Sequence, residues 1–114
     1  MPEPINYNFE VRVVIFQENG IWIAQGLEWD ITGHGKTTDA ALENFGHTLL
    51  GQAIVDIHHG EIPLAKTPEA PQFCFRRWEE AEYQGKQPKS FVTPKETPDA
   101  FIISALAADT RLAA

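Results

Sequence analysis

Apolar and polar residues alternate along the first part of the chain, from Tyr7 to Gln17. A period of two predicts a β-strand that buries one of its faces. The dipeptide Asn19-Gly20 follows, and both residue types tolerate the positive φ angles of a two-residue type I′ turn. Residues 21–27 are again rich in apolar side chains. The pattern therefore predicts a β-hairpin with residues 21–27 as its return strand.

The two-residue turn also predicts the register of the hairpin, with Glu18 opposite Ile21. Counting back from that pair, one face carries Phe9, Val11, Val13, Ile15, Trp22 and Ala24. We expect that face to form the core. The opposite face carries Val14, Phe16, Ile21, Ile23 and Leu27. It is too apolar for a solvated face, so we expect either the C-terminal half or a second copy to cover it.

A short third strand over residues 30–34 and a long helix are predicted next. Thr38 is the expected N-cap of the helix, which runs to about His59 and is followed by Gly60. Its apolar residues recur at helical spacing, at Leu42, Phe45, Leu49, Ala53 and Ile57. This stripe matches the apolar face of the predicted sheet.

Four glycines in this region suggest special backbone positions. Gly33 and Gly35 suit a tight turn with positive φ angles between the strand and the helix. Gly46 and Gly51 weaken the helix, so we interpret them as points where it closely approaches the sheet or another helix.

Prolines divide residues 61–114 into short pieces. Residues 71–84 are predicted to form a helix with Cys74, Phe75, Trp78 and Ala81 on one side. Residues 86–99 are predicted to be a polar loop. Residues 100–107 favour a strand because of Ile102 and Ile103, although the alanine-rich tail suits a helix equally well.

These elements predict one α+β domain over residues 1–114, with a core at 7–60 and a proline-rich extension at 61–114. We expect a mostly antiparallel sheet of three or four strands packed on one long helix, plus a second short helix. The length of 114 residues fits a single domain, and a hydrophobic fraction of 43% excludes wholesale disorder.

The net charge of −7 is concentrated in the first half of the chain. Residues 1–60 hold eight acids against Arg12 and Lys36, a net charge of −6. Such a surface repels phosphate, so we expect no direct nucleic-acid binding and favour a basic protein as the partner. The alternative is that these charges serve only solubility.

No apolar run approaches the roughly 20 residues of a membrane span, and Glu3 and Glu10 argue against a signal peptide. We therefore expect a cytoplasmic protein. The single cysteine, Cys74, excludes an internal disulfide and cannot by itself build a zinc site.

Candidate catalytic patterns are weak. The segment from Gly33 to Thr37 is similar to a phosphate-binding loop, but Asp30 stands where that loop needs its first glycine. The carboxylates of Glu10, Glu28, Asp30 and Asp56 are not expected to converge on two metal ions. The four histidines lack metal-ligand spacing, so we expect no enzyme activity, cofactor or metal.

The stretch from Phe9 to Asp56 resembles the HicB-like antitoxin domain. The residues that match are Glu18, Asn19, Gly20, Trp22, Ala24, Gly33, Gly35, Thr37, Ala40, Ala41, Leu42 and Asn44. The resemblance implies a truncated ribonuclease H-like fold that binds and neutralises a small basic ribonuclease toxin. Many family members add a C-terminal DNA-binding segment, but residues 86–114 have neither of its usual patterns, so we expect a stand-alone domain.

We therefore expect a non-catalytic antitoxin-like module that occludes a basic partner. The predicted partner residues are Glu28, Trp29, Asp30, His34, Asp39 and Glu43, expected around one end of the sheet and the helix start. Self-association to a homo-oligomer is expected through Val14, Phe16, Ile21 and Ile23. The alternative is an orphan oligomeric scaffold or regulatory protein, and a metal-dependent nuclease is less favoured.

Overall fold

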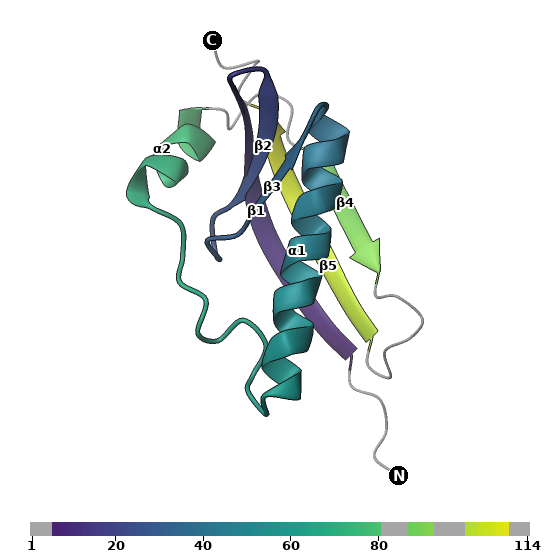
Figure 1. Cartoon of the computed structure of the whole chain (residues 1–114). Helices are drawn as coiled ribbons and strands as arrows, with labels where there is room; N and C mark the ends of the chain where they lie inside the picture. The colour runs from purple at the N-terminus through teal and green to yellow at the C-terminus, as the bar shows by residue number, and fades with distance from the viewer. Residues whose placement is uncertain (1–5, 81–86, 93–99, 110–114) are drawn as a thin grey trace.

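Five strands and two helices make up the described part of the chain in a computed structural model, which covers residues 6–80, 87–92 and 100–109. The strands form one sheet in the order β3-β2-β1-β5-β4. The elements are β1 (Asn6–Glu18), β2 (Ile21–Gly26), β3 (Thr32–Gly35), α1 (Thr38–His58), α2 (Gln72–Glu80), β4 (Gln87–Val92) and β5 (Ala100–Asp109). The long helix α1 lies along one face of the sheet, and the short α2 lies beside the hairpin (Figure 1). The predicted α+β class is confirmed.

The hairpin of β1 and β2 has the predicted register. Glu18 pairs with Ile21, and the pairing continues in step to Gly26. Asn19 and Gly20 have φ angles of 51° and 79°, as a type I′ turn requires. Because a slip of one residue would exchange the two faces of each strand, this register decides which side chains are buried.

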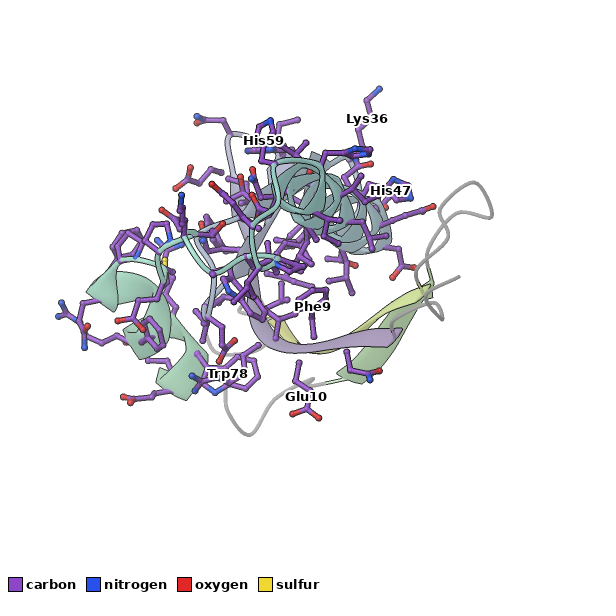
Figure 2. The ribbon with its side chains drawn as sticks, turned by 90° about the horizontal axis from the view of Figure 1, so that it is seen from below. Phe9, Glu10, Lys36, His47, His59 and Trp78 are labelled. Carbon is purple, nitrogen blue, oxygen red and sulfur yellow. The ribbon has the colours of Figure 1, made fainter. Side chains whose placement is uncertain are left out.

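The face of the sheet toward α1 forms the main core. Figure 2 shows Phe9 directed toward α1 and Glu10 on the opposite side of the sheet. All six residues predicted for the core face are buried there, namely Phe9, Val11, Val13, Ile15, Trp22 and Ala24. They pack with residues of α1 that include Ala41, Leu42, Phe45, Leu49, Leu50 and Ala53.

The glycines next to α1 act differently from our prediction. Gly33 and Gly35 do not have positive φ angles. The helix backbone instead lies directly on them: a Cβ atom on Gly33 would collide with the backbone nitrogen of Phe45 and the carbonyl oxygen of Ala41. Gly46 is buried, but Gly51 is exposed with open space around it, so the close approach predicted there is wrong.

Thr37, rather than Thr38, is the N-cap of α1. Thr37 has an extended backbone, and its side-chain oxygen accepts a hydrogen bond from the backbone N–H of Ala40 at 3.0 Å. An N-cap must reach the N–H three residues ahead while staying outside the helix, and Thr38 already has helical geometry. At the other end, Gly60 has a φ angle of +73° and follows the helix as predicted.

The opposite face of the hairpin is partly covered by the chain's own second half. A second cluster unites Val14, Leu27, Ala70, Cys74 and Trp78, so α2 and the segment before it lie on this face. The segment is fixed by two backbone hydrogen bonds, one from Ala70 to Leu27 and one from Asp30 to Pro68. The helix predicted over 71–84 is observed as Gln72–Glu80, and residues 81–84 lie outside the described residues.

The last two strands extend the sheet beyond β1. The segment for which strand and helix were both open is the strand β5, which pairs in parallel with β1. The strand β4, antiparallel to β5, occupies a stretch predicted as loop. The sheet therefore has one more strand than expected. Pro88 and Lys89 suggested a loop, but both residue types also suit an edge strand, and β4 is at the edge.

Candidate functional site

The turn between β2 and β3 carries three of the predicted partner residues. Glu28 is half-buried, and its carboxylate accepts hydrogen bonds from the backbone N–H and the Nε of Arg12, both at 2.7 Å. The Trp29 ring meets Phe9 edge to face, with centroids 5.7 Å apart, and packs against the main core. Asp30 is exposed, but its carboxylate accepts a hydrogen bond from the Gln25 side chain at 2.9 Å and its backbone N–H donates to Pro68. All three turn residues therefore help to hold the fold.

The other three predicted partner residues lie where β3 leads into α1. Asp39 and Glu43 are exposed and one helical turn apart. His34 is exposed on β3, and its carbonyl oxygen accepts a hydrogen bond from the Asn44 side chain at 2.6 Å. Within the described ranges, neither Asp39 nor Glu43 has a cation within ion-pair distance. This part of the surface therefore carries unneutralised negative charge.

The structure does not bring these six residues together. β3 pairs with β2 from Thr32, beside the turn, to Gly35, beside the start of α1. The turn residues and the helix residues therefore lie at opposite ends of β3 (Figure 1). The predicted grouping around one end fails because a helix that follows a strand begins at the end where that strand finishes. Asp39 and Glu43 remain together on α1. His34 pairs with Ile23 and stands between Gly33 and Gly35, which both lie against α1, so its side chain is on the opposite face of the sheet.

The predicted self-association residues are covered unequally. Val14 is fully buried in the cluster with α2, so α2 replaces a second copy at that position. Phe16 and Ile23 pair across the hairpin, and both are half-buried. Ile21 is 41% exposed. The end of the hairpin near its turn thus keeps accessible apolar surface.

Two arginines, one on β1 and one on α2, lie over aromatic rings, which the sequence analysis did not predict. The pairs are Arg12 with Phe75 and Trp78, and Arg77 with Phe16 and Phe73. The shortest of the four distances, from the Arg77 guanidinium carbon to the Phe16 ring centroid, is 4.3 Å. Each arginine joins α2 to β1, one from each element. Spacing on α2 could have shown only that Phe73 and Arg77 share a face.

The acidic residues considered for metal chemistry are separated. Among the described residues, no three His, Cys, Asp or Glu side chains lie close enough to hold a metal ion. Glu10 is on the far side of the sheet from α1 (Figure 2), and Glu28 is bound to Arg12. Asp56 is buried and accepts hydrogen bonds from the Gln52 side chain and the Leu64 backbone N–H. Asp56 therefore fixes the segment that follows α1.

The surroundings of the single cysteine do not favour a reactive thiol. Cys74 is buried, and this burial raises the pKa of its thiol, although nearby Arg77 opposes the shift. A thiol with a raised pKa is a weak nucleophile.

No helix in the described part of the chain is both long and apolar enough to cross a membrane.

No protein-family model matches the chain, and no curated protein or solved structure shows detectable similarity to it. The chemistry of its surfaces is therefore what bears on function.

Proposed function

We propose that the protein is a non-catalytic protein-binding module of the HicB antitoxin type, which binds a small basic protein such as a ribonuclease and blocks it by occlusion. The exposed acidic pair Asp39 and Glu43 carries this proposal. Like charges one helical turn apart destabilise a helix. Asp39 lies in the first turn, where the helix dipole favours a carboxylate, so the pair is tolerated in the free protein, and a basic partner lying across α1 would offset the repulsion between the two charges.

The charge balance around this pair supports a basic partner. Of the two bases in residues 1–60, Arg12 is already paired with Glu28 at 2.7 Å, which leaves Lys36 against several exposed acids. The net charge of −7 attracts a basic protein over roughly 10 Å at moderate salt. The element order β1-β2-β3-α1 agrees with the one implied by the resemblance in residues 9–56. The proposed setting is the cytoplasm, where such a ribonuclease would meet RNA.

The proposed contact uses the outer side of α1, away from the sheet. In Figure 2 the labelled side chains of Lys36 and His47 project away from the sheet on this side. Binding there would need no change in the core, because α1 buries its other side against β1, β2 and β3. Helix α1, supported by the sheet behind it, would then sterically block the surface of the partner that it contacts.

The test compares Glu43→Lys with Glu79→Lys, which makes the same charge change at an exposed position of α2. Each protein is immobilised and exposed to lysate of its own cells, and the proteins retained are identified by mass spectrometry. We expect the wild type and Glu79→Lys to retain a small basic protein that Glu43→Lys loses. The retained protein should cleave RNA, and one equivalent of the wild type should stop the cleavage.

Circular dichroism of all three proteins controls for folding. Equal retention by Glu43→Lys and Glu79→Lys would contradict the proposed surface. Retention of no basic protein by the folded wild type would contradict the antitoxin-type function and favour the orphan scaffold.

A further inference from the structure

The end of the hairpin near its turn carries apolar side chains that α2 does not bury. We define the hairpin patch as Phe16, Ile21, Ile23 and Phe73. Ile21 is 41% exposed and Phe73 is 50% exposed. Phe16 pairs directly with Ile23 across the hairpin. Both Phe16 and Phe73 lie against the same Arg77 guanidinium, at 4.3 and 5.5 Å, so Phe73 of α2 is continuous with the strand residues.

We propose that the hairpin patch is the contact surface between two copies of this chain. The charges at the patch favour a second copy over another partner. Arg77 lies among its aromatic rings, and Glu18 is exposed beside it, opposite Ile21 in the hairpin. A two-fold contact sets the same surface against itself, so a patch with both signs of charge can match its own copy.

A partner protein whose charges are mainly of one sign fits the hairpin patch less well than a second copy. A strongly basic protein would meet Arg77 at the centre of the patch, and a strongly acidic one would meet Glu18 and the net charge of −7. A second copy can place its Glu18 near the first copy's Arg77, in both directions at once. Aromatic residues and arginine are also the types enriched at the centres of protein contacts.

This contact leaves the outer side of α1 accessible. The hairpin patch lies on the sheet face that α2 covers, and α1 lies on the other face. A dimer through the hairpin patch would therefore present two acidic α1 surfaces to solvent. The inference does not depend on the proposed binding of a basic protein, because the two surfaces share no residue.

The test measures molar mass by size-exclusion chromatography with light scattering, and affinity by sedimentation. The matched variants are Ile21→Lys and Ile62→Lys, because both isoleucines are exposed, at 41% and 76%, and only Ile21 belongs to the hairpin patch. We expect the wild type and Ile62→Lys at twice the 12.8 kDa chain mass. Ile21→Lys should dissociate at least about tenfold more readily, which corresponds to about 1.4 kcal/mol.

Phe73→Ser provides a second variant, because an exposed aromatic residue at a helix surface can be shortened with little effect on folding. It should weaken the dimer as Ile21→Lys does. A wild type that stays at 12.8 kDa up to about 1 mM would overturn the proposal, as would equal weakening by Ile21→Lys and Ile62→Lys. Glu43→Lys should leave the dimer intact, so loss of the basic partner and loss of the dimer are separate outcomes.

Discussion

The two faces of the sheet are covered by helices in different ways. α1 has 21 residues and brings a continuous set of large apolar side chains onto β1, β2 and β3, with its backbone directly against Gly33. α2 has nine residues, and its cluster contains only Val14, Leu27, Ala70, Cys74 and Trp78. Two arginines stacked on aromatic rings supplement that small cluster.

This difference predicts that α2 detaches from the sheet at a lower free-energy cost than the unfolding of α1 and the main core. Apolar burial contributes about 25 cal/mol per Å², so the larger inner cluster dominates the folding free energy. A nine-residue helix is unstable on its own, and its structure depends on docking. We therefore expect α2 to leave the sheet in a local opening that does not unfold the core.

The largest expected effect is at the contact between α1 and β3. Gly33→Ala places a Cβ atom against the backbone of Phe45 and Ala41, which cannot rotate away as a side chain could. We expect a loss of about 3 kcal/mol or more in the free energy of unfolding, measured by urea denaturation. A loss below about 1 kcal/mol would show that α1 can shift on the sheet, and the contrast between the two faces would weaken.

Removing the main anchor of α2 should have a smaller and more local effect. Trp78 is buried in the outer cluster, and Trp78→Ala should cost about 3 kcal/mol of α2 docking. Hydrogen exchange should show lost protection in residues 72–80 with protection of α1 retained. Phe45→Ala is the matched control on the inner face, where we expect protection to fall throughout α1. Equal loss in both helices after Trp78→Ala would contradict independent docking.

The Arg12–Glu28 pair should contribute less than Trp78. Glu28→Gln removes the charge that holds the Arg12 guanidinium beside Phe75 and Trp78. We expect a cost of about 1 kcal/mol in urea denaturation, because both side chains are partly exposed. Glu61→Gln, which breaks the more exposed pair with Lys66, should cost less than about 0.5 kcal/mol. Equal costs for Glu28→Gln and Glu61→Gln would mean that the contacts of Arg12 with the Phe75 and Trp78 rings add no stability.

The smallest expected effect is a gain. Gly51 lies on the exposed side of α1 with nothing within 4 Å of a Cβ atom placed there. Gly51→Ala should therefore stabilise the protein by about 0.5 to 1 kcal/mol, seen as a higher urea midpoint with an unchanged slope. A loss of stability would show that this side of α1 is not free, and would point to a contact there.

The sequence predicted local structure well where short-range patterns decide it. Alternation and the Asn19-Gly20 turn gave the hairpin register, and helical spacing gave α1 to within a residue or two. The sequence did not reveal contacts between backbone segments that are far apart in the chain. Gly33 was assigned a positive φ, because nothing local shows that a helix backbone will lie on it.

The candidate site was harder to predict than the fold because it depends on which segments meet. The turn residues Glu28 and Asp30 seemed close to the helix start, but the direction of β3 separates them. The covering of Val14 by α2 and the stacking of Arg77 on Phe16 join positions far apart in the chain. β4 was missed because proline and lysine mark loops and edge strands alike.

The single cysteine provides the most direct test of separate stabilities. Cys74 lies on the buried side of α2, and burial raises the pKa of its thiol, so the folded protein should react slowly with a thiol reagent at pH 8. Labelling rates measured in increasing urea, beside the circular dichroism of the whole chain, report opening of α2 and global unfolding separately. We predict that Cys74 becomes reactive at urea concentrations where the circular dichroism still shows the folded core. Labelling that rises only together with global unfolding would contradict the account, because α1 and α2 would then form one cooperative unit.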